Sequence, residues 1–425
     1  MISSVFVLAV FSLVWRQGNI LQSGLPKPFE LLIFLTAVLL LLSFRSLPSV
    51  ADKMKTVLRF SVPFGIFFIF AALGNLNSAL NFPEWQIYWH EVLAEYGRLI
   101  FVGLFFLLTA YLAFIQPSII KKSLIAVAIA PLIFWFALLP SWQSKFIFED
   151  ERLRGAGNDP NIFGSFVMLA LIISLAFFLY EEGFRRRLAL LNVFLLFPLF
   201  IWAGSRSALL SFFAAFALLS LVYLIKVFSW PRFRSVSTGA AVLVLSFVFS
   251  FAILPQAAIK VFVWRFVPSA YVQSFGFSGA QAAETAAVAA LLHQFDIKRI
   301  QIIWDSIDRL KNLPVGLGSM YHNWQPMGVL NGYKVGPHNS FLEVGLTAGY
   351  LGLAGWLVFL GGVSAKTFKL FRRDDPISMA LAVSFFALMF FSFFVHTLTF
   401  RWLWLIMGFI VAQRQPPYVD ITKSL

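Results

Sequence analysis

Long apolar stretches alternate with short polar segments along the whole chain. Stretches such as 31–42, 193–203 and 240–254 contain no charged residue. A helix that crosses a bilayer needs about 20 predominantly apolar residues, and fewer where the bilayer thins around it. The pattern predicts about twelve spans, at residues 3–15, 29–47, 57–76, 93–114, 119–139, 161–180, 187–203, 207–228, 236–254, 338–362, 377–396 and 400–413. Residues 378–413 fit either a hairpin or one broken span, so the number of spans is open there.

The composition agrees with a membrane protein. Of 425 residues, 60% are hydrophobic and 12% are charged, whereas a soluble domain carries about 25% charged residues. Soluble enzymes, fibrous proteins and disordered proteins are therefore excluded. The chain has no cysteine, which excludes disulfides, cysteine-ligated zinc and iron–sulfur clusters.

The charge balance, 33 basic against 19 acidic residues, gives +14. In a membrane protein such an excess points to cytoplasmic loops and membrane lipid headgroups, not to nucleic acid. With the N-terminus inside, the short cytoplasmic loops hold most basic side chains, while loop 77–92 has none. The pattern predicts that both termini are cytoplasmic. The basic residues of these loops are Arg45, Lys53, Lys55, Arg59, Lys121, Lys122, Arg185, Arg186, Arg187, Lys226, Arg232, Arg234, Lys366, Lys369, Arg372 and Arg373.

The predicted fold class is an all-α polytopic membrane protein in three parts. Residues 1–254 form the first nine spans, 255–337 a long, partly helical outer loop, and 338–425 the last three spans and a cytoplasmic tail. Within the loop, apolar residues at helical spacing predict an amphipathic helix that lies on the membrane or covers the bundle. These residues are Ile297, Ile300, Ile303, Trp304, Ile307 and Leu310.

Three arginines stand out at the outer surface. Arg154 follows Arg152 in a Gly- and Pro-containing turn, where Asn161 can cap the next helix. Arg206 lies in a hairpin with almost no loop, and an arginine there is costly unless it is paired or binds an anion. Arg265 lies in an apolar neighbourhood after the ninth span. The alternatives are a capped loop with solvated charges for Arg154, and anchoring to lipid headgroups for Arg206 and Arg265.

His338 is the candidate for proton chemistry. It precedes Asn339 and Ser340 at the mouth of the tenth span, where an imidazole can accept or give a proton near neutral pH. A histidine that only caps the helix is the alternative. Gly345, Gly349 and Gly352 follow on roughly one helix face and permit close packing. The histidines share no metal spacing, so no metal site is predicted.

Taken together, these segments resemble the O-antigen ligase and polymerase superfamily of bacterial envelope glycosyltransferases, and within it most closely the ligase. The resemblance rests on four motifs that occur in order and are surrounded by about a dozen spans. They are Gly157–Asn161, Gly204–Arg206 with Leu210, Asn312–Gly318, and His338–Ser340 with its trailing glycines.

The resemblance implies a GT-C-like fold with a periplasmic loop, in the bacterial inner membrane. It also implies that O-antigen is transferred, with inversion and without metal or other cofactor, from undecaprenyl pyrophosphate to a sugar hydroxyl of lipid A-core. Arg154, Arg206 and Arg265 are the residues implied to bind the pyrophosphate, because arginine forks suit phosphate oxygens. His338 and Arg265 are the implied catalytic residues, His338 acting on the acceptor hydroxyl.

Other functions stay open. An O-antigen polymerase uses the same donor with a second lipid-linked glycan as acceptor, and protein O-oligosaccharyltransferases share the histidine motif. A transporter of lipid-linked glycan would bind pyrophosphate without chemistry, and the lack of an internal repeat weakly disfavours it. The O-antigen and core sugars are not encoded in any motif of the chain.

Overall fold

The computed structural model is a bundle of helices with one short β pair. It describes residues 1–14, 28–43, 50–81, 84–139, 152–155, 159–226, 229–256, 258–259, 262, 300–319, 329–330, 333–334 and 337–413. The elements in this part are α1 (Ile2–Phe11), η1 (Ser12–Val14), α2 (Pro28–Ser43), α3 (Val50–Asn81), α4 (Glu84–Ile115), α5 (Ser118–Ile129), η3 (Ala130–Leu138), α7 (Pro160–Tyr180), α8 (Gly183–Ala203), α9 (Arg206–Lys226), α10 (Trp230–Ile253), β1 (Val329–Leu330), β2 (Tyr333–Lys334), α13 (Ser340–Phe371), α14 (Pro376–Ser392) and α15 (Arg401–Ala412).

Every predicted span contains a helix in the part of the chain that the structure describes, but residues 393–396 of the predicted span 377–396 are not helical and not every helix has full length. Eight helices of the described part are long and apolar enough to cross a membrane: α3, α4, α5 with η3, α7, α8, α9, α10 and α13. The other four, α1, α2, α14 and α15, have apolar helical segments of 10–17 residues. A helix rises about 1.5 Å per residue, so most of these are too short to cross a bilayer of about 30 Å as straight helices. The polytopic helical class is confirmed, and twelve full-length spans are not.

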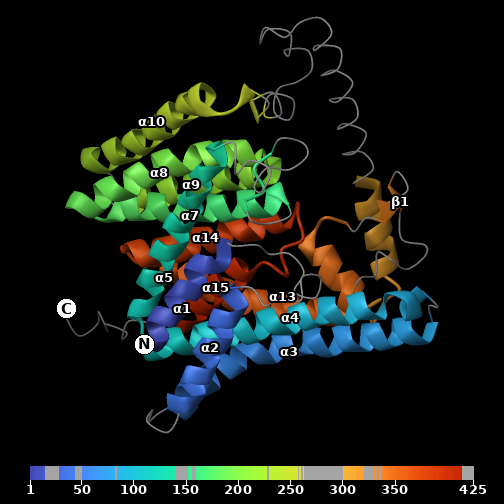
Figure 1. Cartoon of the computed structure of the whole chain (residues 1–425). Helices are drawn as coiled ribbons and strands as arrows, with labels where there is room; N and C mark the ends of the chain where they lie inside the picture. Colours follow the sequence, from blue (N-terminus) through green and yellow to red (C-terminus); the bar gives the residue numbers. More distant parts are fainter. Residues whose placement is uncertain are drawn as a thin grey trace, which may run out of the picture.

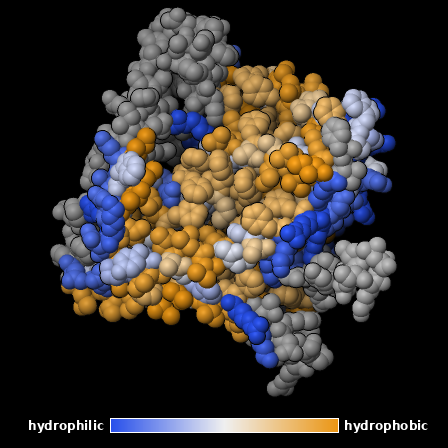
Figure 2. Space-filling view, turned by 180° about the vertical axis from the view of Figure 1, so that it is seen from behind, coloured by the Kyte–Doolittle hydropathy of each residue, from blue (hydrophilic) through white to orange (hydrophobic). Residues whose placement is uncertain are grey.

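The helices form layers around α7 (Figure 1). In the most apolar 18-residue window of α7, 94% of the residues are buried. It packs against α8, α9 and α14, while α10 covers α8 from the outside. On the opposite side of α14, helix α15 packs on α4 and helix α13 on α3. Figure 2 shows a broad hydrophobic band with hydrophilic residues gathered at its two ends, as expected for a membrane bundle.

One end of the bundle collects the basic residues of the loops predicted to be cytoplasmic. Lys121 at the start of α5 is bonded to Glu181 after α7, with 2.5 Å between Nζ and Oε1. Arg232 in the first turn of α10 pairs with Asp374 before α14, with 2.9 Å between Nη2 and Oδ2. Contacts between loops distant in sequence thus place these charges at one end, and their cytoplasmic location stays a prediction.

The segment whose number of spans the sequence left open is a hairpin. Helices α14 and α15 are separated by residues 393–400. The end of α15 returns to the start of α14, because Arg373 Nη1 donates to Gln413 Oε1 at 3.2 Å. Nearby, Lys366 Nζ donates to the carbonyl of Val411 at 2.5 Å. Residues 393–400 therefore lie at the end of the bundle opposite to the basic loops.

Helix α13 is broken at Gly349, whose φ of 71° and ψ of 178° lie in a region that only glycine adopts readily. The break leaves the carbonyls of Leu346 and Thr347 without partners in the next turn. They accept instead from the amides of Leu317 at 2.7 Å and Gly318 at 3.0 Å. The glycines of the 312–318 motif are needed here because a Cβ on Gly316 would overlap Thr347.

The predicted close packing of the α13 glycines is confirmed, and most of their partners belong to the outer loop. A Cβ on Gly345 would meet Leu310, one on Gly349 would overlap the carbonyl of Pro314, and one on Gly352 would lie 3.1 Å from Phe70 of α3. These glycines therefore let segment 310–318 lie directly on α13. The motifs 312–318 and 338–352, far apart in the sequence, form one packed unit.

The predicted amphipathic helix is present at residues 300–310, and its apolar residues divide between the protein and an exposed face. Ile302 and Ser306 are buried, at 9% and 2% exposure, whereas Ile300 and Trp304 are exposed at 55% and 65%. The helix thus contacts the protein through one face and presents Ile300 and Trp304 outward. Beyond it, β1 and β2 form an antiparallel pair, so the fold is not purely α-helical.

Candidate active site

The segment 152–155 is held against the end of α8. The amide of Leu153 donates to the carbonyl of Trp202 at 3.2 Å. Arg152 is only 5% exposed, and its Nε donates to the carbonyl of Ala203 at 3.0 Å. Its Nη2 donates to Asn161 Oδ1, also at 3.0 Å. Arg152 therefore joins the start of α7 to the end of α8, which is a structural role.

Arg154 lies two residues further along this docked segment, and its side chain is partly exposed. The adjacent Gly155 has a φ of 60°, and a Cβ there would overlap the ring of Phe163. The turn after Arg154 is thus fixed on α7. The structure separates the two arginines of this segment, because Arg152 is buried and bonded to Ala203 and Asn161, whereas Arg154 is partly exposed.

The cap of α7 differs from the one expected. Asp159 is the N-cap residue, and its Oδ1 accepts from the amide of Asn161 at 2.6 Å. The side chain of Asn161 accepts from Arg152 instead of capping the helix. A carboxylate at the N-cap can accept from the first amides of the helix and also favours the positive end of its dipole, which leaves the asparagine for Arg152.

Arg206 is the first residue of α9 and follows a tight turn. Helix α8 ends at Gly204, which adopts the left-handed conformation with φ 58° and ψ 31°. The amide of Gly204 donates to the carbonyl of Ile201 at 3.0 Å, so the chain reverses at once and α9 begins after the buried Ser205. The partly exposed Arg206 side chain therefore lies at the amino end of a helix, where backbone amides and the helix dipole also favour an anion.

His338 has left-handed backbone geometry, with φ 48°. Such a conformation is uncommon for a residue with a Cβ, and it is found where the surroundings hold it in place. The N-cap of α13 is Asn339, whose Oδ1 accepts from the amides of Phe341 at 3.0 Å and Leu342 at 3.1 Å. Capping is thus done by Asn339, and the capping alternative for His338 is wrong.

The start of α13 is joined to the connection between α14 and α15. Asn339 Nδ2 donates to the carbonyl of Phe393 at 3.1 Å. Ser340 Oγ donates to the carbonyl of Val395 at 2.9 Å and accepts from the amide of Thr397 at 2.7 Å. Asn339 and Ser340 therefore hold the backbone that follows His338 in place through hydrogen bonds to the α14–α15 connection.

Two further side chains near the start of α13, those of His396 and Glu343, belong to no motif in the sequence. His396 lies on the α14–α15 connection, and its ring is inclined by 26° to that of His338, with 6.1 Å between centroids. Glu343, in the first turn of α13, has one carboxylate oxygen that is buried and without a hydrogen bond among the described residues. Glu343 interacts electrostatically with His396 and with Glu95 of α4. Glu95 is also paired with Arg98, three residues further along α4.

The segments that carry Arg154 and Arg206 lie at the same end of the bundle as His338 and His396. Helices α9 and α14 pack side by side, and Lys226 at the end of α9 donates to the carbonyl of Arg373 just before α14. They are therefore antiparallel, and the start of α9 lies toward the end of α14. Phe166 near the start of α7 contacts Trp402 of α15, with 5.0 Å between ring centroids. Arg206, Arg154 and the His338–His396 pair thus occupy one end, opposite to the basic loops.

Arg265 lies outside the described residues, so its position stays a prediction. Within the described residues, no group of three or more histidine, aspartate or glutamate side chains is placed to hold a metal ion.

Among known protein families, residues 191–357 match the family model described as O-antigen ligase. This segment contains Arg206, the 312–318 loop and His338, which belong to three of the four motifs on which the resemblance rested, and the fourth, Gly157–Asn161, lies outside it. No curated protein and no solved structure matches the chain. The family indicates glycosyltransferase chemistry of the ligase or polymerase type in a multi-pass membrane protein. Residues 191–357 are thus similar to the O-antigen ligase family, and this similarity supports an O-antigen ligase assignment for that part of the chain.

Proposed function

We propose that the chain transfers O-antigen from undecaprenyl pyrophosphate to a sugar hydroxyl of lipid A-core, at the periplasmic face of the bacterial inner membrane. The observation that supports this most directly is the position of His338. It lies just outside a capped helix, at the same end of the bundle as Arg154 and Arg206. A proton acceptor and two cations at one membrane surface suit a reaction in which a lipid pyrophosphate leaves and a hydroxyl attacks.

In this mechanism the acceptor hydroxyl oxygen attacks the anomeric carbon of the donor sugar. The bond between that carbon and the pyrophosphate oxygen breaks, and its electron pair passes to the leaving pyrophosphate. One displacement inverts the anomeric configuration. The hydroxyl proton passes to the imidazole of His338, so proton and charge balance.

Arg154 and Arg206 stabilise the leaving pyrophosphate. Their guanidinium groups keep their charge in an apolar setting and fit two phosphate oxygens at once. The first amides of α9 add donors beside Arg206. Arg265 joins them as a third cation. With this charge supplied by fixed donors, the leaving group has its stabilisation without a metal.

Glu343 and His396 support His338 in the same proposal. His396 lies beside His338, with 6.1 Å between ring centroids, and the carboxylate of Glu343 interacts with His396. In this proposal both groups position the imidazole of His338.

Reconstitution with defined substrates tests the proposal. The purified protein in liposomes is supplied with lipid-linked O-antigen and either lipid A-core or a second portion of donor, with and without EDTA. Product on lipid A-core in EDTA is expected. Longer lipid-linked chains without ligation would identify a polymerase, and loss of activity in EDTA with recovery on Mg²⁺ would overturn the metal-free mechanism.

A further inference from the structure

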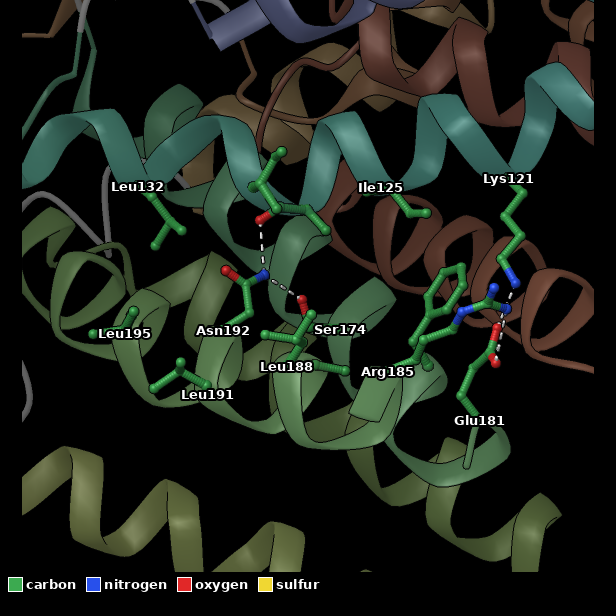
Figure 3. Close-up of a pocket in the computed structure, with 14 residues that line it drawn as sticks. Lys121, Ile125, Leu132, Ser174, Glu181, Arg185, Leu188, Leu191, Asn192 and Leu195 are labelled. Atoms are coloured by element: carbon green, nitrogen blue, oxygen red, sulfur yellow. Dashed lines mark hydrogen bonds and ion pairs between the residues drawn. The ribbon is translucent and has the colours of Figure 1, made fainter. Parts of the chain in front are cut away.

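A groove runs between α5 and α8 at the end of the bundle that holds the basic loops (Figure 3). Its volume is about 440 Å³, within the range of small-molecule sites. One end is polar, where Lys121 and Arg185 converge on Glu181, and the other end is apolar, with Leu132 and Leu195. We call this the α5–α8 groove.

Its polar end carries a net positive charge. Glu181 is bonded to Lys121 at 2.5 Å and lies 3.8 Å from Arg185, so two cations share one carboxylate. The Arg185 side chain is 71% exposed and can turn to a second anion without leaving a buried contact. Lys121 also lies over the Phe177 ring, 5.8 Å from its centroid, which fixes the ammonium group at the mouth of the groove.

Hydrogen bonds fix the spacing between the helices that form the walls of the groove. Asn192 of α8 donates through Nδ2 to the carbonyl of Ala128 on α5 at 3.0 Å and to Ser174 Oγ on α7 at 2.8 Å. It joins three helices at one depth (Figure 3). The groove therefore exists before anything binds in it, and a ligand does not have to separate the helices.

The groove is open to the bilayer along its length. Ile125 and Ile129 on one wall are 43% and 44% exposed, and Leu188 and Leu191 on the other are 47% and 52% exposed. In a membrane these side chains face acyl chains. From Lys121 to Leu132, eleven residues along the helix correspond to about 16 Å, which is half the hydrocarbon thickness of a bilayer. The groove thus spans one leaflet, from headgroup depth to the midplane.

We propose that the α5–α8 groove binds one anionic glycerophospholipid, with its phosphate at Lys121 and Arg185 and an acyl chain along Leu132 and Leu195. Charge at one end and apolar lining at the other match this lipid and no soluble anion. The site is independent of the proposed transfer reaction. It lies at the end of the bundle opposite to His338 and Arg206, so a donor with its pyrophosphate at those residues would not reach Lys121.

Native mass spectrometry of the full chain tests this site, with phosphatidylglycerol or phosphatidylcholine added to protein stripped of lipid. We expect one phosphatidylglycerol to be retained in preference to phosphatidylcholine. A basic residue near a lipid headgroup contributes about 1 kcal/mol, so Arg185→Gln should weaken retention about fivefold. Ala189→Phe, which fills the groove without changing charge, should prevent retention.

Two matched variants control for net charge and for added bulk. Arg234→Gln removes an exposed arginine at the same end, and Leu221→Phe enlarges a side chain, 55% exposed, that faces lipid on α9; neither lines the groove. Both should bind as wild type does. Equal retention of the two lipids, or wild-type retention by Arg185→Gln, would overturn the proposal. Displacement by glycerol 3-phosphate would identify a phosphate site in place of a lipid site.

Discussion

Substitution of His338 separates a chemical role from a structural one, because its backbone is left-handed. Alanine retains a Cβ and, like histidine, costs about 1–2 kcal/mol in this conformation. Glycine has no such cost, although it loses more chain entropy on folding, by about 0.5–1 kcal/mol. His338→Ala and His338→Gly should therefore differ from wild type by no more than about 2 kcal/mol in the free energy of unfolding.

A loss of that size does not account for inactivity. A protein that is stable by about 5 kcal/mol remains over 99% folded after losing about 2 kcal/mol. A general base contributes about 10²–10⁴ in rate. Both variants should therefore insert, unfold near the wild-type temperature and transfer O-antigen at most about a hundredth as fast.

The assay measures ligation in liposomes together with thermal unfolding of the same preparation. Asn339→Ala is the control, because it removes the cap on Phe341 and Leu342 at a cost of about 1 kcal/mol while the chain still carries the imidazole of His338. It should lower the unfolding temperature and keep more activity than either His338 variant. If His338→Gly ligated within tenfold of wild type, or if activity followed stability through the series, His338 would be no base.

Three further predictions concern Arg206, the break in α13 and the topology. Arg206→Lys keeps the charge and loses the planar fork, so ligation should fall although the protein unfolds as wild type does; unchanged ligation would leave Arg206 as a headgroup anchor. Gly349→Ala should destabilise by about 1–3 kcal/mol through its backbone conformation and by overlap with segment 310–318, measured by thermal unfolding, whereas Gly361→Ala, which meets open space, should not destabilise. Reporter fusions at Lys121 and Gln294 should report opposite sides of the membrane, and the same side for both would contradict the proposed placement of the active site.

The sequence predicts what depends on local pattern. Apolar length gave the positions of the helices, and the glycines at 345, 349 and 352 correctly indicated close packing. His338 and Arg206 could be singled out because a histidine before a helix and an arginine in a short hairpin are unusual at a membrane surface.

Other features depend on contacts between distant segments and have no local signal. His396 joins the site only because the α14–α15 hairpin brings residue 396 beside residue 338. The different roles of Arg152 and Arg154 depend on which one meets the carbonyl of Ala203. On helix 300–310, the apolar pattern alone does not show that Ile302 and Ser306 are buried while Ile300 and Trp304 are exposed.

The break at Gly349 also divides α13 into two parts that contact different segments of the chain. Residues 340–348 are bonded to the outer loop through Leu346 and Thr347, and to the α14–α15 connection through Asn339 and Ser340. They belong to a cap assembled from three parts of the chain, and the long remainder of the helix belongs to the bundle. The orientation of His338 is therefore set by this cap. Displacement of the 312–318 loop is therefore expected to move residues 340–348 and the adjacent His338 while the remainder of α13 stays in place.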